Sequence, residues 1–413
     1  MHRFAFLFLV FLAFIALDYY VFQAIRLLFQ QQNPWLKNSV YVIYWSLTLL
    51  TLVGILFWNR MDTYELAHFR SFVASGMVMN LTGKLLSGII VFFDDIIRLG
   101  KYVYRGVVQN GAVNQATEGI TRSEFLAQSA IVAGAVPFAM MSYGILSGAY
   151  DYRVRRKTIY LSNLPKAFDG LKVAQLSDIH SGSFYNKKAV QGGVDLLLKE
   201  KPDLFLFTGD LVNNESREVK DYMDIFSKVK APLGQFSVLG NHDYGDYKHW
   251  RSAGAKQQNL QDLIESHKNM GWDIMLNEHR YVTVDGEKLA LIGVENWGKG
   301  RFAKYGDLEK AAQNVEADTK ILLSHDPSHW DAQVRPQFSD IDLTLSGHTH
   351  GFQFGVEIGD FRWSPSQYMY KQWADLYQEG SQYLYVNRGF GFLGYPGRIG
   401  ILPEITILEL KRA

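Results

Sequence analysis

Two kinds of hydrophobic pattern divide the chain. In its first third, long apolar stretches with few charges cover about residues 4–22, 40–58, 72–93 and 129–150. A helix of about 20 apolar residues is long enough to cross the hydrocarbon core of a bilayer. The pattern therefore predicts a region with three or four transmembrane helices over residues 1–152.

Each stretch has an alternative interpretation. Stretch 40–58 carries no charge, and the only alternative to a membrane span there is a buried helix of a water-soluble protein. Stretch 72–93 contains Lys84 and several glycines, so whether it spans stays open. The first stretch would also fit a cleaved signal peptide, but a second apolar stretch follows closely, which favours an anchor. Basic residues flank the stretches almost equally on both sides, so the positive-inside rule assigns no side of the membrane to residues 153–413.

From residue 153 to residue 413 the pattern changes to short apolar runs alternating with amphipathic stretches. Strands are expected at residues 171–176, 203–207, 236–239, 288–294, 320–323, 341–345, 383–386 and 404–410. Helical periodicity appears over residues 187–199 and 219–229. So many strands, with helices between the early ones, predict an α/β domain of two packed mixed β-sheets flanked by helices.

Composition narrows the possible functions. The 42 basic and 41 acidic residues nearly balance, which argues against binding of a nucleic acid polymer. The chain has no Cys, so disulfides and thiolate metal ligands are excluded. Any metal site must therefore use oxygen and nitrogen ligands.

Potential ligands of that kind follow directly after five of the predicted strands. In chain order they are Asp178 and His180, Asp210, Asn241 with His242 and Asp243, His325, and His348 with His350. The two i, i+2 pairs point their side chains the same way in an extended chain. The carboxylate of Asp210 has two oxygens and can bridge two cations. Five of the 11 histidines lie in these positions, which favours a shared site over scattered surface residues.

Taken singly, these clusters have simpler explanations. Gly-Asp or Asn-His-Asp in a loop is often only a turn. His325 and His329 have the i, i+4 spacing of a zinc-protease helix, but Pro327 lies between them and the required Glu is absent, which excludes that motif. The ordered recurrence of all five clusters is what favours a metal site.

In this order the residues resemble the calcineurin-like metallophosphoesterase family. The matching segments are Asp178-Ile179-His180, Gly209-Asp210, Gly240-Asn241-His242-Asp243, His325 and Gly347-His348-Thr349-His350. The resemblance covers roughly residues 158–413. Within the family the chain is similar to the membrane-associated branch typified by a bacillus cell-wall-binding phosphoesterase and lipid A precursor hydrolases. That branch usually has a Gly at the position of Phe352, so a ring there is expected to reshape the pocket mouth.

The resemblance implies a four-layer αββα sandwich that binds two divalent ions, for which manganese, iron and zinc all suit the ligand types. It assigns Asp178, His180 and His350 to one ion, Asn241, His325 and His348 to the second, and Asp210 to a bridge. It also implies His242 as the proton donor to the leaving group, with Asp243 as a candidate to orient it. Arg388 and Arg398 are candidate substrate clamps, and ordinary ion pairs would explain them equally well.

We therefore expect a multi-pass membrane protein, placed in the bacterial inner membrane, that hydrolyses a phosphoester or pyrophosphate bond by attack of a metal-activated hydroxide. Its expected partners are membrane lipids and a phosphorylated, lipid-linked substrate such as a UDP-diacylglucosamine-type lipid A precursor. Two alternatives remain. One is a catalytically silent scaffold, although such proteins typically lose ligands and every position is filled here. The other is a small transporter with an attached hydrolase, although apart from Lys84 and Asp94-Asp95 the stretches lack buried ionisable residues.

Overall fold

The computed structural model describes residues 2–61, 64–108 and 122–413. The chain splits into two compact units, Met1–Tyr143 and Gly144–Ala413. We call them the helical unit and the sheet unit, and each is described by itself.

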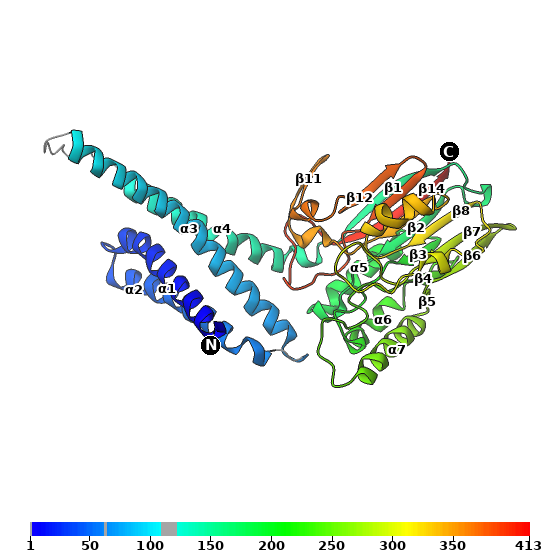
Figure 1. Ribbon diagram of the computed structural model, residues 1–413, viewed down its shortest axis with the longest axis horizontal. Coiled ribbons are helices and arrows are strands. Elements are labelled where there is room, and N and C mark those ends of the chain that lie inside the picture. The colour runs from blue at the N-terminus through cyan, green and yellow to red at the C-terminus, as the bar shows by residue number, and fades with distance from the viewer. Residues whose placement is uncertain (1, 62–63, 109–121) are drawn as a thin grey trace. The chain divides into compact units, whose positions relative to one another are not determined.

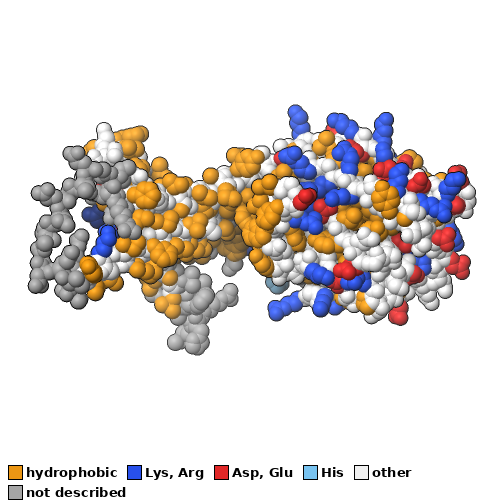
Figure 2. All heavy atoms as spheres, turned by 90° about the horizontal axis from the view of Figure 1, so that it is seen from above, with side chains coloured by type: hydrophobic (Ala, Val, Ile, Leu, Met, Phe, Trp, Pro, Cys, Tyr) orange, Lys and Arg blue, Asp and Glu red, His pale blue; other side chains and the backbone are white. Residues whose placement is uncertain are grey.

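Long helices form the described part of the helical unit (Figure 1). They are α1 (His2–Phe29), α2 (Pro34–Phe57), α3 (Ala67–Val108) and α4 (Arg122–Leu146), the last of which continues into the sheet unit. The stretches long and apolar enough to cross a membrane are Phe11–Phe29, Pro34–Phe57, Ala67–Tyr104 and Glu124–Tyr150. The third apolar stretch is therefore one of four candidate spans. Figure 2 shows that hydrophobic side chains dominate the visible surface of these helices.

Small residues let α3 and α4 approach closely. A Cβ added to Gly83 would lie 2.5 Å from the carbonyl oxygen of Gly134. The Ser87 hydroxyl donates a hydrogen bond of 2.7 Å to the Ala130 carbonyl. Close backbone approach at small residues is typical of helix pairs in membranes, where lipid supplies no hydrophobic drive for association.

A buried ion pair links α1 to α3. Asp18 is fully buried, and its carboxylate pairs with the ammonium of Lys84. Lys84 also donates to the Thr48 hydroxyl at 2.8 Å. Sequence patterning did not reveal this pair, because the two residues lie in different apolar stretches. Asp18 is thus a buried ionisable residue beyond Lys84 and Asp94-Asp95, contrary to the expectation that the stretches hold no others.

The sheet unit contains two six-stranded sheets. The first is ordered β1 (Arg153–Leu161), β14 (Glu404–Arg412), β2 (Leu171–Leu176), β3 (Leu204–Phe207), β4 (Gln235–Ser237), β5 (Asp273–Ile274). The second is ordered β12 (Asp375–Glu379), β13 (Gln382–Val386), β9 (Leu343–Ser346), β8 (Thr319–Leu323), β7 (Glu287–Gly293), β6 (Glu278–Val284). Strands β10 (Val356–Ile358) and β11 (Phe361–Trp363) form a separate antiparallel hairpin.

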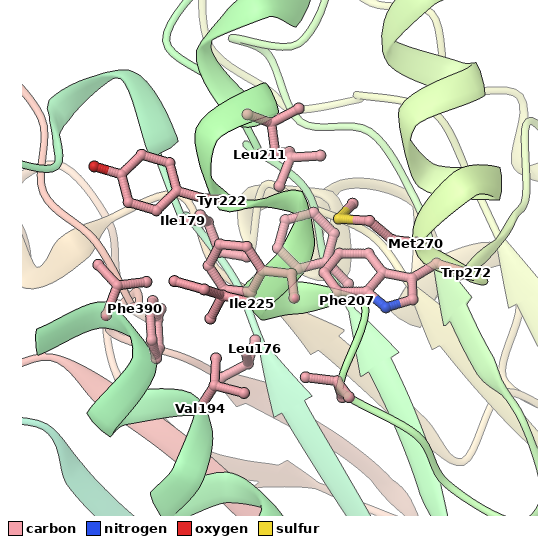
Figure 3. Packing of buried hydrophobic residues seen from close by; sticks show 14 of the residues in the cluster. Leu176, Ile179, Val194, Phe207, Leu211, Tyr222, Ile225, Met270, Trp272 and Phe390 are labelled. Carbon is pink, nitrogen blue, oxygen red and sulfur yellow. The ribbon is translucent and has the colours of Figure 1, made fainter. Parts of the chain in front are cut away.

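Alternation along β3 shows how the layers are built. Leu204 and Leu206 face the second sheet, where they pack in one buried cluster with residues such as Leu323. Phe205 and Phe207 face the other way and pack with Trp272 against the helices (Figure 3). Side chains in a strand alternate between its faces, so one strand contributes to two cores.

Helices cover both outer faces. Those packed on the first sheet are α5 (Lys187–Lys199), α6 (Met223–Phe226) and α7 (Ala253–Met270). On the second sheet, α8 (Leu308–Ala311) and the π-helical turn Trp330–Val334, followed by α9 (Arg335–Gln337), complete the layer. The expected α/β fold, two mixed sheets flanked by helices, is confirmed.

Several elements differ from the sequence prediction. Residues 219–229, predicted as one helix, form the 3₁₀ turn Ser216–Tyr222 followed by the single turn of α6. Helix α7 was not predicted, although its Ser252 N-cap accepts from the Ala255 N–H and Gly271 ends it in a left-handed conformation. Its low apolar content hid its periodicity.

Candidate metal centre

The expected ligands all follow the carboxyl ends of strands. Strands β2, β3 and β4 run parallel, and so do β8 and β9. Parallel strands end at the same edge of their sheet. After β2 come Asp178 and His180, after β3 Asp210, after β4 Asn241, after β8 His325, and after β9 His348 and His350.

Two groups of potential ligands result. The first contains Asp178, His180 and His350, and the second contains Asp210, His325 and His348. Within each group the donor atoms lie within 4.8 Å of one another. Residues up to 172 positions apart therefore meet: Nε2 of His350 lies 3.2 Å from Oδ1 of Asp178 and 3.1 Å from Nε2 of His180.

Asp210 contacts both groups. Its Oδ2 lies 3.5 Å from Nε2 of His180 and 3.1 Å from Nε2 of His325. The other oxygen, Oδ1, accepts the backbone N–H of His242 at 2.8 Å. The carboxylate of Asp210 thus lies between the histidines of the two groups, which is the position that a bridging ligand requires.

Asn241 contributes a buried amide oxygen to the site. Its amide nitrogen donates to the Tyr247 hydroxyl at 2.9 Å, whereas its Oδ1 is buried and, among the described residues, has no hydrogen-bond partner. A buried orphan carbonyl is unfavourable unless a ligand satisfies it. The donor set of carboxylates, imidazoles and this amide oxygen fits divalent manganese, iron or zinc.

Outer hydrogen bonds fix two of the imidazoles for this role. The Nδ1–H of His180 donates to Asn213 Oδ1 at 3.1 Å, and that of His325 donates to the Thr208 carbonyl at 2.8 Å. Each ring therefore directs its Nε2 into the cluster. Such partners orient metal-binding histidines and fix their tautomer.

His348 is turned the other way. Its Nδ1 faces Nε2 of His325 at 3.3 Å, while its Nε2 lies 2.8 Å from the hydroxyl of Tyr370. Tyr247 and Tyr370 thus both border the centre. Sequence reasoning missed them, since neither lies within a motif and their positions depend on how the loops fold.

The loops bearing these residues adopt an unusual backbone. Five of the seven expected ligands have positive φ, between 48° and 70°. These are Asp178, His180, Asp210, His348 and His350. Non-glycine residues rarely occupy this left-handed region, and where they do, strain often marks a functional site. Gly209 adds a tight approach, because a Cβ there would lie 2.4 Å from the Gly240 nitrogen.

Burial and charge set the protonation of the cluster. Burial would raise the pKa of the Asp178 carboxyl, but the neighbouring His350 outweighs it and holds that pKa below its usual range. Burial lowers the pKa of His180 to about 3, so this imidazole is neutral. Burial would also lower the pKa of His325, yet the charge of Asp210 raises it to about 10. A cation at His325 therefore has to displace a proton.

His242 borders the cluster without belonging to either group of donors. Its ring centroid lies 5.0 Å from that of His180, and its Nδ1 lies 2.8 Å from the Asn213 carbonyl, to which it donates. Asp243 does not orient it, contrary to the expectation. Its buried carboxylate instead accepts the backbone N–H groups of Asp210, Leu211 and Gly240 at 2.8 Å each, so it ties two ligand loops together.

Arg388 and Arg398 are fully buried, which is unlike a substrate clamp that reaches into solvent. Arg388 forms ion pairs of 2.7 Å with Glu357 and Glu404. Arg398 donates to backbone carbonyls and to Nδ1 of His350 at 3.1 Å. The structure therefore gives both arginines internal partners, and it places Arg398 behind His350, a potential ligand of the first group.

Comparison with known proteins relates both parts of the chain to phosphoesterases. Residues 2–149 match a family model described as a probable calcineurin-like phosphoesterase transmembrane domain, and residues 171–352 match the calcineurin-like phosphoesterase model. The chain is 29% identical over 289 residues to the uncharacterized metallophosphoesterase YkuE of Bacillus subtilis, covering 66% of this chain and 94% of that one.

Two further relatives extend the similarity. A transmembrane protein with metallophosphoesterase domain from Danio rerio is 29% identical over 335 residues, 78% of this chain and 69% of its own. The phosphodiesterase YaeI of Escherichia coli is 26% identical over 294 residues, 70% of this chain and 99% of its own.

Proposed function

Because the chain belongs to the calcineurin-like metallophosphoesterase family, and is a metal-dependent phosphoesterase with membrane helices, we propose that it cleaves a phosphoester or pyrophosphate bond of a lipid-linked substrate at the membrane surface. The observation that carries this proposal is the convergence of two donor groups on the shared carboxylate of Asp210.

We assign seven side chains to two divalent ions. Asp178, His180 and His350 hold the first, Asn241, His325 and His348 hold the second, and Asp210 bridges them. The contacts of Asp210 with both groups and the orphan oxygen of Asn241 support this assignment. When bound, a pair of such ions supplies a nucleophile from water at neutral pH and neutralises the charge of the phosphate.

His242 is the residue we assign to proton delivery. Its Nδ1–H bond to the Asn213 carbonyl leaves Nε2 as the nitrogen that carries the transferable proton. Its place next to His180, outside both donor groups, suits a group that protonates the leaving oxygen. Asp210 and Asp243 hold the loop that carries it through backbone N–H groups.

The candidate membrane spans are the reason to propose an amphiphilic substrate. A bilayer-bound enzyme meets lipids at high local concentration, and a UDP-diacylglucosamine-type lipid A precursor or a polyprenyl phosphate has the required bond. With such a substrate the protein would work in the bacterial inner membrane.

The full chain in detergent should hydrolyse an aryl phosphodiester when Mn²⁺ is added. His350→Ala should abolish this activity and lower the metal content, because it removes one donor of the first group. The exposed His249→Ala is the matched control and should leave both unchanged. Full activity in His350→Ala would reject the ligand assignment. A panel of nucleotide-linked glycolipids, lipid phosphates and soluble nucleotides then tests the substrate class.

A further inference from the structure

The segment that follows the last expected metal ligand displays apolar side chains to solvent. Over residues 352–369 the exposed large hydrophobic residues are Phe352, Phe354, Val356, Ile358, Phe361, Tyr368 and Met369. Ile358 and Phe361, at the end of hairpin β10–β11, are 73% and 62% exposed. Single exposed apolar residues are ordinary, but a contiguous group marks an interaction site.

The hairpin is amphipathic with its polar face turned inward. Glu357 and Arg362 pair across the strands. Glu357 forms ion pairs with Arg155 and Arg388, and Arg362 pairs with Asp375 at 3.0 Å. A two-residue period therefore directs the neighbouring apolar side chains outward.

The outward face consists of the exposed Val356, Ile358 and Phe361 together with Trp363, which pairs with Val356 and is half-buried. This orientation is the reverse of that of a hairpin covering a hydrophobic core. Ion pairs fix it, so it is not an accidental exposure of a loose loop. The apolar face of the hairpin therefore suits contact with an apolar environment outside the sheet unit.

Backbone contacts join the hairpin to the end of a candidate membrane span. The fourth span, Glu124–Tyr150, ends inside the sheet unit. There the Gly144 carbonyl accepts the N–H of Arg398 at 3.2 Å, and the next residue, Ile399, accepts the N–H of Gly355 at 2.9 Å. Ile399 also bridges to Phe354, two residues before β10. A single backbone segment, Arg398–Ile399, thus lies between the start of the hairpin and a helix end that has to leave the bilayer.

We propose that hairpin β10–β11 is a membrane-docking element, which inserts Val356, Ile358, Phe361 and Trp363 into the interfacial region of the bilayer that holds the fourth span. Because backbone contacts join the hairpin to the end of that span, we infer that its apolar face contacts lipid and not a protein partner. In Figure 1 the strand labelled β11 stands out from the body of the sheet unit, as an inserting element should.

The same segment is anchored in the metal centre at both ends. His350 lies two residues before it, and directly after it the hydroxyl of Tyr370 lies 2.8 Å from Nε2 of His348, while the Thr349 hydroxyl donates to the Trp373 carbonyl at 2.6 Å. Docking of the hairpin would therefore set the height and orientation of the centre relative to the lipid headgroups. This consequence, unlike the docking itself, rests on the proposed function.

The absence of Cys allows a direct test. The full chain with Ile358→Cys is labelled with an environment-sensitive fluorophore and reconstituted in phosphatidylcholine–phosphatidylglycerol vesicles containing a spin-labelled lipid quencher. Quenching should be several-fold stronger than for Gln261→Cys, an exposed control position on α7. Equal quenching at the two positions would overturn the proposal. A label shielded from aqueous iodide but not quenched by lipid would also overturn it, because it would indicate a protein partner.

A second measurement separates docking from chemistry. The double variant Ile358→Ser/Phe361→Ser should hydrolyse a soluble aryl phosphodiester as the parent does, yet lose activity several-fold on a lipid-anchored phosphoester in the same vesicles. Tyr160→Ser, at an exposed residue of β1, should change neither rate. Equal loss on both substrates would reject the docking role. If the parent hydrolyses neither substrate, the proposed function fails, while the quenching result still decides on docking.

Discussion

Ionisable side chains are buried in both units, but in two different ways. In the helical unit, Asp18 and Lys84 neutralise each other, and Lys84 also lies 5.0 Å and 4.9 Å from the ring centroids of Phe14 and Tyr44. In the sheet unit, carboxylates, imidazoles and an amide converge, and Asn241 Oδ1 has no partner among the described residues.

This difference separates a structural from a functional use of buried charge. A closed pair such as Asp18–Lys84 holds α1 against α3, and removing one partner leaves the other unpaired. A converging set with surplus acceptors needs an additional cation. On the proposed assignment, its strained backbone and loop-tying carboxylates keep these side chains in place for that cation.

The largest effect should come from the group that borders the metal centre. His242→Ala should retain both metals but lower kcat by about 10²–10⁴-fold, the usual contribution of a positioned acid. The loss should be smallest for aryl esters, because good leaving groups need little protonation. Metal analysis and kcat across a leaving-group series give the test. Loss of metal together with activity would show that His242 is a ligand, and the assignment of ligands would have to change.

Breaking the closed pair should affect stability and not chemistry. Asp18→Asn should lower the free energy of unfolding of the full chain by about 3 kcal/mol, because it leaves the Lys84 charge unpaired in apolar surroundings. The double variant Asp18→Leu/Lys84→Leu should recover most of this loss. Titration of the micellar protein with a denaturing detergent measures both, and hydrolysis of a soluble phosphodiester should stay unchanged. A stable Asp18→Asn would contradict the structural role.

A smaller effect tests a buried imidazole in the apolar core. Burial lowers the pKa of His267 to about 3, whereas an unfolded chain protonates His near about 6.5. Only the unfolded state then gains a proton between these values, so stability falls as the pH falls through that window.

Between pH 7 and pH 5 this one group should account for about 2 kcal/mol of the lost stability. His267→Gln should flatten the dependence by that amount, as measured by denaturant unfolding in EDTA. His329→Gln should act similarly, because burial lowers the pKa of His329 to about 4. If the free energy of unfolding depends on pH in the same way for the parent and the variants, these imidazoles are solvated or protonated in the folded state.

Sequence patterning succeeded where the signal is local. Apolar runs predicted the helices of the first third, and the strands around positions 173, 206 and 322 were placed from short apolar segments. The ordered clusters after those strands pointed to the site, because parallel strands bring their carboxyl ends together. Helix α7 and the hairpin β10–β11 were missed, the first for its polar composition and the second for its inverted pattern.

Side-chain partners were beyond such reasoning. Nothing in the sequence around Asp18 indicates Lys84, which lies 66 positions later in another helix. Asp243 follows His242 directly, yet it accepts backbone N–H groups from Gly240 in its own loop and from Asp210 in the neighbouring loop. Arg388 and Arg398 resemble ligand-binding residues in sequence, but folding supplies each with internal acceptors.

By itself, the sequence determined which residues bring the chemistry and where each strand presents them, because residue type and two-residue alternation are properties of the local chain. The tertiary structure alone decided which of these groups meet, which carboxylate stands between the two donor sets and which apolar face is left outside. Those outcomes depend on contacts between segments far apart in the chain, and no local pattern encodes such contacts.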